Sequence, residues 1–290
     1  MRRLGPCSGA LLSGMSLADA PRTETEVEVR GARLALDRTG EGRPVLWGHG
    51  LTSSRAKEER SGLFDWRPVV AAGFEVIRFD ARSHGRSEAV GDIDAHRWPS
   101  LAQDLLGLAD ALGVSSFVAG GASMGCATSI HAAMAAPERI EALVLACPPT
   151  AWDSRARQAG LYSAAAGIVE TDGIAALAEA MADVPPPALF ADEPELRRFD
   201  PDVEESALPL AMRGAAASDL PGLDVLRQLA QPALVLAWTD DPGHPVSTAE
   251  SLAEALPDAE LQVADTLGAV RAWPSEVARW LATTGGAPAR

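Results

Sequence analysis

The sequence predicts an α/β protein with a mostly parallel central sheet flanked by helices. Short apolar runs typical of buried strands alternate with helical patterns, and this alternation produces parallel sheets covered by helices. Turn residues around Gly31 and at 39–42 indicate that the chain opens with a hairpin. The predicted strands are 27–29, 32–36, 45–47, 74–79, 116–119, 142–146, 233–238 and 261–264.

Helical spacing of apolar residues supports the same fold class. It predicts helices at 98–112, 249–256 and 276–281, each covering one face of the sheet. The strand signal stops at 152–228, where Ala-rich helical patterns and a triple proline take its place. We interpret 152–228 as an inserted helical cap, and 23–151 together with 229–285 as the core.

Composition excludes several functional classes. The 290 residues are 47% apolar, enough for one core with an insertion. Twenty-five basic and 40 acidic residues give a net charge of −15, which disfavours nucleic acid and anionic membranes as partners. Three scattered cysteines predict neither a disulfide framework nor a closed zinc site, and suggest a cytoplasmic protein. No run is long enough to span a membrane, and no cofactor, metal or oligomerisation signature is present.

The first 22 residues are interpreted separately from the fold. Arg2 and Arg3 precede a mildly apolar stretch that ends in small residues, the outline of a signal peptide. Glycine, proline and serine dilute this stretch. We therefore expect 1–22 to be a disordered extension, with Met15 as an alternative start.

The segment 121–125 reads Gly-Ala-Ser-Met-Gly and matches G-x-S-x-G. This motif holds a serine on a sharp turn from strand to helix, and the small residues at Gly121 and Gly125 avoid clashes. A strand pattern leads into Ser123 and a helical pattern leads out, so backbone N–H groups would point at a developing oxyanion. The alternative is a tight turn kept for packing.

Three further stretches accompany this motif, and with it they resemble the α/β-hydrolase fold family. His49-Gly50 is similar to the family's oxyanion loop, which implies that the N–H groups of Leu51 and Met124 form the oxyanion hole. The segment 80–87 resembles D-x-R-G-H-G-x-S, with Ser83 in place of a glycine. The resemblance is greatest to capped esterases and lactonases such as enol-lactone hydrolases.

The segment 240–245 is the third stretch and resembles the family's acid loop. The alignment implies that Asp241 is the catalytic acid and that Trp238 replaces a glycine of the G-x-x-D pattern. Asp240 and Asp153 are the alternative acids. His49 and His84 are expected to hold loops by hydrogen bonds.

The histidine that the family supplies after its last strand is absent. That loop, taken as 265–271, contains none, and no histidine follows His244. His244 is the candidate substitute base, since an imidazole titrates near neutral pH. The alternative is a lining or structural role, because a side chain so close to the acid could approach Ser123 from the wrong side.

Three functions follow from these observations. The first is a serine hydrolase of a small ester or lactone with a relocated base. The second is a lyase or isomerase of the same fold, and the third is a catalytically silent ligand-binding or scaffold protein. The expected partner is a small-molecule substrate, in an apolar pocket that the cap would shape above Ser123.

Overall fold

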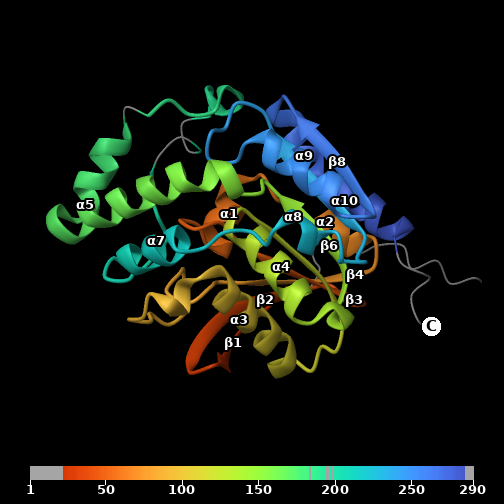
Figure 1. The fold of residues 1–290 in the computed structure, drawn as a ribbon. Helices are drawn as coiled ribbons and strands as arrows, with labels where there is room; N and C mark the ends of the chain where they lie inside the picture. Colours follow the sequence, from red (N-terminus) through yellow and green to blue (C-terminus); the bar gives the residue numbers. More distant parts are fainter. Residues whose placement is uncertain (1–21, 183, 194–195, 197–198, 285–290) are drawn as a thin grey trace, which may run out of the picture.

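The computed structural model describes residues 22–182, 184–193, 196 and 199–284. Within these residues, one sheet has the strand order β1-β2-β4-β3-β5-β6-β7-β8 (Figure 1). β1 pairs antiparallel with β2, and β2 with β4, whereas all other neighbours are parallel. The strands are β1 Arg22–Val29, β2 Ala32–Thr39, β3 Arg43–Gly48, β4 Phe74–Phe79, β5 Phe117–Ala122, β6 Ile140–Ala146, β7 Ala233–Trp238 and β8 Ala259–Ala264. Each predicted strand is confirmed.

The opening hairpin has the predicted tight turn. Arg30 and Gly31 both adopt positive φ, 48° and 76°, as a two-residue type I′ connection requires. β1 begins at Arg22, one residue before the predicted start of the core, and the rest of the predicted extension lies outside the described residues.

The parallel strands are buried on both faces. In β3, Leu46 packs into one hydrophobic cluster, and its neighbours Val45 and Trp47 pack into a second one on the opposite face. Helices α3, α4 and α9 contribute to the first cluster, and α2 and α10 to the second. The core helices are α1 Arg55–Ser61, α2 Arg67–Ala71, α3 Trp98–Ala111, α4 Met124–Ala135, α9 Val246–Ala255 and α10 Leu267–Thr283.

The connection after β8 is shorter than predicted. The sequence suggested a loop over 265–271, but Thr266 caps α10 with its side chain and the helix begins at Leu267. The fold therefore leaves only Asp265 and Thr266 between the last strand and the last helix.

The segment between β6 and β7, which the sequence predicts to be a cap and which is called the cap segment or cap below, is mostly helical. It contains the short 3₁₀ turns η4 Trp152–Ser154 and η5 Ala188–Phe190, and the helices α5 Arg155–Ala182, α7 Leu208–Ala216 and α8 Leu223–Leu226. Helix α5 bends at Gly173 and extends away from the sheet beside α7 (Figure 1). Arg155 anchors it to the core, because its guanidinium lies 4.3 Å from the Trp98 ring and donates to the Ser218 carbonyl.

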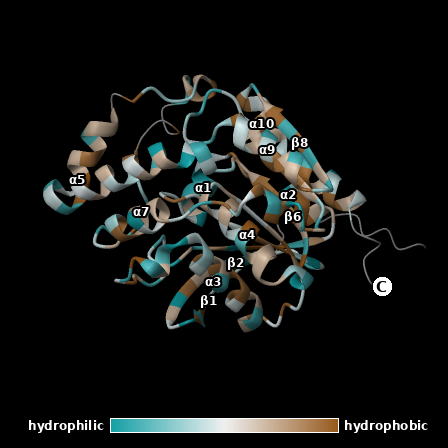
Figure 2. Cartoon of the chain, viewed as in Figure 1, coloured by the Kyte–Doolittle hydropathy of each residue, from teal (hydrophilic) through white to brown (hydrophobic). Residues whose placement is uncertain are grey.

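The helices carry both hydrophilic and hydrophobic residues, as Figure 2 shows. None of the described helices combines the length and the apolar character needed to cross a bilayer.

Candidate active site

Ser123 lies on the turn between β5 and α4. Its backbone has φ 53° and ψ −105°, a strained conformation that a non-glycine residue adopts only when its surroundings enforce it. The flanking glycines allow the required close packing. A Cβ on Gly125 would lie 2.1 Å from the carbonyl oxygen of Gly48, and one on Gly121 would lie 2.4 Å from the backbone of Gly125. Both glycines of the motif are thus required by backbone contact.

A continuous hydrogen-bonded chain leads from Ser123 into the loop after β7. Nε2 of His244 lies 2.8 Å from Oγ of Ser123, and Nδ1 lies 2.8 Å from Oδ2 of Asp241. The same carboxylate accepts the indole N–H of Trp238 on Oδ2 and the backbone N–H of Gly243 on Oδ1, each at 2.9 Å. The side chains of His244 and Asp241 are 24% and 14% exposed, so both are mostly buried but remain partly accessible to solvent.

The electrostatics favour an ionised Asp241. Burial alone would raise the pKa of Asp241, but the hydrogen bond and charge of His244, the Trp238 N–H and the Gly243 N–H together lower it well below its ordinary value. An ionised carboxylate beside Nδ1 holds the proton on that nitrogen and leaves Nε2 free to accept the Ser123 proton. The arrangement can therefore perform nucleophilic catalysis with general-base assistance.

The alternative acids lie elsewhere. Asp240 and Asp153 are both exposed, and neither makes a hydrogen bond to His244 within the described part of the chain. Asp240 has φ 61° at the start of the acid loop. Asp265, which follows β8, is also exposed.

The loop after β3 runs beside the nucleophile. A Cβ on Gly50 would lie 3.7 Å from Cβ of Ser123. In the region that the structure describes, the N–H groups of Leu51 and Met124 donate to no acceptor, whereas the N–H groups of Ser123 and Gly125 donate to the carbonyls of Ala146 and His49. Leu51 and Met124 thus carry donors available to a ligand.

Buried histidines hold this loop in place. The Nδ1–H of His49 donates to the Gly50 carbonyl at 2.8 Å, and its Nε2 accepts the Ala81 N–H at 3.0 Å. Burial, with the neighbouring His84, lowers the pKa of His49 to about 4, so its ring is neutral at pH 7. The ring of His84 lies 2.7 Å from the carbonyl oxygen of Leu51. Both histidines therefore use their ring nitrogens on backbone groups.

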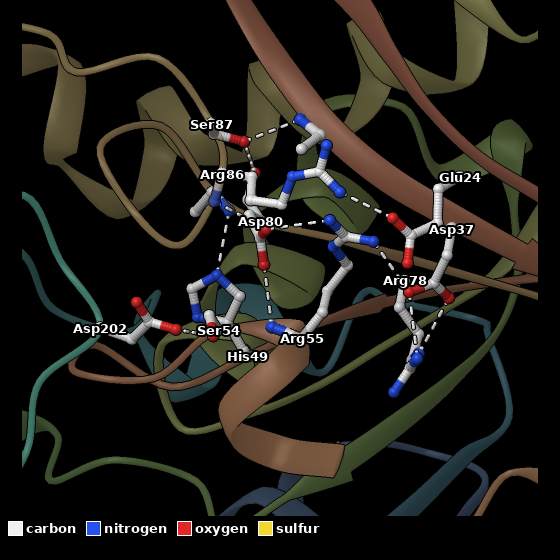
Figure 3. A network of polar contacts seen from close by, with 12 residues as sticks. Glu24, Asp37, His49, Ser54, Arg55, Arg78, Asp80, Arg86, Ser87 and Asp202 are labelled. Atoms are coloured by element: carbon white, nitrogen blue, oxygen red, sulfur yellow. Dashed lines mark hydrogen bonds and ion pairs between the residues drawn. The ribbon is translucent and has the colours of Figure 1, made fainter. Parts of the chain in front are cut away.

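An ionic network lies behind the same loop (Figure 3). Asp80 accepts the backbone N–H and a guanidinium N–H of Arg55, at 2.8 and 3.1 Å, and the backbone N–H of Arg86. Arg55 also pairs with Asp37, which Arg78 contacts in turn. These contacts join α1 to β2 and β4, and so fix the end of the loop that carries Gly50.

The remaining chemically reactive side chains are not part of this chain of contacts. Cys126 and Cys147 are free and buried, and burial raises the pKa of both thiols. His96 contacts Ser83, and His131 contacts the Asp219 carbonyl. Among the described residues, no group of three or more His, Cys, Asp or Glu side chains could hold a metal ion.

The best-formed cavities among the described residues count against the predicted apolar pocket above Ser123. The largest of the four best-formed cavities among the described residues, about 530 Å³, is lined by residues such as Phe64, Trp66 and Arg78 and does not include Ser123. The cavity next to the turn that carries Ser123, lined by residues such as Met124 and Gly125, holds only about 10 Å³. Several apolar side chains of the cap pack against one another instead: Ala166, Val169, Leu177, Val203, Leu208 and Met212 form a cluster of their own.

Sequence reasoning also missed the role of Trp238. The sequence marked it only as a replacement for a glycine, whereas its indole is a hydrogen-bond donor to Asp241. An aromatic N–H three residues before a candidate acid was the available signal.

Fold and site define an α/β protein whose serine lies on a tight strand-to-helix turn. Residues 43–165 match the family model described as alpha/beta hydrolase fold. The chain has the α/β-hydrolase fold.

Comparisons with individual proteins agree with this assignment. A segment of 124 residues, 41% of this chain, is 31% identical to an epoxide hydrolase of Caballeronia sordidicola and covers 35% of it. The fold is similar to that of the enol-lactonase from Burkholderia xenovorans LB400, with a TM-score of 0.73 and 24% identity over 89% of this chain and 99% of that one. A thermophilic esterase from Thermogutta terrifontis gives a TM-score of 0.72 and 25% identity over 92% of this chain and 100% of that one.

Proposed function

We propose that this chain is a serine hydrolase that cleaves a small carboxylic ester or lactone. The observation that carries the proposal is the continuous hydrogen-bonded chain from Ser123 Oγ through the His244 ring to Asp241, with both links at 2.8 Å. Ser123 would be the nucleophile, His244 the general base and Asp241 the acid that orients it.

The geometry supports a two-step acyl transfer. Nε2 of His244 takes the proton of Ser123 as Oγ attacks the carbonyl carbon, and the carbonyl oxygen becomes an oxyanion. The N–H groups of Leu51 and Met124, which donate to no acceptor among the described residues, are the proposed donors to that oxyanion. The imidazolium then gives its proton to the leaving alkoxide, which departs and leaves an acyl group on Ser123. A water, deprotonated by His244, attacks this acyl-enzyme and releases the acid and Ser123.

The substrate class draws on the comparisons as well. Two of the similar structures are named as an enol-lactonase and an esterase, and both cover nearly the whole of this fold. Gly50, the residue before Leu51, lies beside Ser123, since a Cβ on it would be 3.7 Å from Cβ of Ser123.

A covalent probe tests the proposal before any substrate is known. A fluorophosphonate should add one adduct to the protein by intact mass, and the adduct should map to Ser123 and be absent in Ser123→Ala. The rates of hydrolysis of short p-nitrophenyl esters, of simple lactones and of the epoxide styrene oxide should then be compared, with Ser123→Ala as the blank. Absence of an adduct after long incubation would reject the serine-hydrolase proposal and favour a lyase, isomerase or silent binding protein.

A further inference from the structure

The Trp238 indole is placed against the carboxylate of the proposed triad. Trp238 is the last residue of β7, and its Nε1–H donates to Oδ2 of Asp241 at 2.9 Å. This is the oxygen that Nδ1 of His244 contacts at 2.8 Å, while Oδ1 accepts the Gly243 N–H. The indole and the imidazole therefore share one carboxylate oxygen, so a change in one contact alters the strength of the other.

Two elements outside the acid loop fix the orientation of the indole. The ring of Trp238 lies parallel to that of Trp273 in α10, with centroids 5.7 Å apart, and meets Phe190 of η5 edge-on at 5.0 Å. It also faces the His244 ring edge-on at 6.2 Å. The indole N–H is thus oriented by the last helix and by the cap, independently of the loop it stabilises.

The acid loop needs such an external contact. Asp241 and His244 are separated by only two residues, and a backbone hydrogen bond from His244 N–H to the Asp241 carbonyl closes the turn between them. A carboxylate on a short turn can still rotate about its terminal bond, because that torsion is broad. The Gly243 N–H holds one oxygen and the Trp238 N–H holds the other, so the two donors together fix the plane that faces the imidazole.

The other titratable groups near Asp241 do not compensate its charge. Burial raises the pKa of the Cys147 thiol and of the Tyr162 phenol, and the charge of Asp241 adds to both effects, so these groups are neutral at pH 7. Asp240 on the same loop is exposed. Within the described residues, no Arg or Lys forms an ion pair with Asp241. Neutral N–H donors therefore carry the stabilisation of this carboxylate, apart from His244 itself.

We propose that Trp238 is a positioning residue that orients the Asp241 carboxylate and limits how strongly it holds a proton on His244. This inference rests on the proposed function for its kinetic consequence, but its electrostatic consequence can be measured without any substrate. Because the indole N–H withdraws negative charge from Oδ2, its loss leaves the carboxylate a stronger acceptor for the imidazolium. The imidazolium then persists to higher pH, and the neutral base is less available at pH 7.

The decisive variant is Trp238→Phe, which keeps an aromatic ring between Trp273 and Phe190 but removes the N–H. Trp273→Phe is the matched control, because it keeps an aromatic ring stacked on the Trp238 indole and leaves the Trp238 N–H in place. Ring signals of the five histidines are followed by NMR through a pH titration, and the His244 signal is assigned by its loss in His244→Gln. We expect the His244 titration midpoint to rise by roughly half a pH unit or more in Trp238→Phe and to stay at the wild-type value in Trp273→Phe.

The kinetic readout separates positioning from mere packing. In Trp238→Phe, kcat for an ester should fall about tenfold at pH 7 with KM within twofold, and the acid limb of the pH–rate profile should move to higher pH. If wild-type protein hydrolyses no ester but the NMR midpoint shifts, the proposed function fails and the role of Trp238 stands. If the His244 midpoint is unchanged or lower in Trp238→Phe, the role of Trp238 is rejected whatever the activity. If Trp238→Phe does not fold, Trp238 is replaced site-specifically by 3-benzothienylalanine, which exchanges only the N–H for sulfur. The His244 titration midpoint of that protein then tests the role of Trp238 in the same way.

Discussion

Nδ1 of His244 lies 2.8 Å from Oδ2 of Asp241, although only two residues separate them in one loop. Pro242 and Pro245 restrict the backbone of this loop, so the mutual geometry of the two side chains is set locally. The contact between His244 and Ser123 is set by the sheet, because β5, β6 and β7 are consecutive parallel strands whose carboxyl ends lie side by side. An imidazole in the loop after β7 can therefore reach Ser123 at the end of β5.

Removal of the imidazole should abolish most of the proposed activity. We expect His244→Ala to lower ester turnover by a factor on the order of 10² or more, because Ser123 loses its proton acceptor. Turnover is measured with a short p-nitrophenyl ester, and circular dichroism checks the fold. Asp265→Ala is the control, since this exposed residue occupies the place after β8 where the base was expected and should remain within twofold of wild type. Comparable turnover in His244→Ala and wild type would reject His244 as the base.

Three Asp→Asn variants test which aspartate is the catalytic acid. Asp241→Asn should reduce kcat by on the order of 10² or more, because an amide can present an N–H to Nδ1 and so favour the wrong imidazole tautomer. Asp240→Asn and Asp153→Asn should stay within about twofold, since both side chains are exposed and remote from the imidazole contact. A larger loss in either control than in Asp241→Asn would move the acid to that position.

The second glycine of the motif should be intolerant of any side chain. A Cβ in Gly125→Ala would lie 2.1 Å from the Gly48 carbonyl oxygen, so the turn must open. We expect the free energy of unfolding to fall by about 1–3 kcal/mol. The fluorophosphonate adduct should also be lost. Gly160→Ala, at an exposed position of α5 with no atom within 4 Å, should instead gain about 0.5–1 kcal/mol. Urea unfolding of both variants provides the measurement, and an undiminished stability in Gly125→Ala would contradict the packing argument.

Glu58 should make the stability of the protein fall as pH rises. Burial raises the pKa of Glu58 to about 8, against the lowering effects of the Trp47 N–H and the Arg78 charge. The ordinary value is 4.5, so between pH 4.5 and about 8 the folded state binds the proton more tightly than the unfolded state does. Stability then decreases with pH, by at most about 1.4 kcal/mol per pH unit from this group.

The variant that removes this titration is Glu58→Gln, whose amide oxygen can still accept the Trp47 N–H. Its stability relative to wild type should increase from pH 5 to pH 8 in urea unfolding, whereas Glu254→Gln, at an exposed position, should show no such trend. A stability difference between Glu58→Gln and wild type that stays constant over this range would show that Glu58 does not titrate as described.

The elements that local patterns specify were predictable from the sequence. The strands 74–79 and 233–238 were predicted with their observed bounds, because short, mainly apolar runs between turn residues are enough to define buried parallel strands. The tight turn at Ser123 was predictable for a similar reason, since Gly121 and Gly125 encode a backbone approach that no other residue permits.

The sequence by itself determined the order of strands and helices, the Gly-x-Ser-x-Gly turn and the absence of a histidine after β8. Only the tertiary structure decided that the His244 ring points to Ser123, 121 positions away, and that the Trp238 indole donates to Asp241. It also decided that apolar side chains of the cap pack on one another. The physical reason is that strand and turn signals are local, whereas side-chain direction and cavity shape depend on how parallel neighbours and packed helices bring distant residues together.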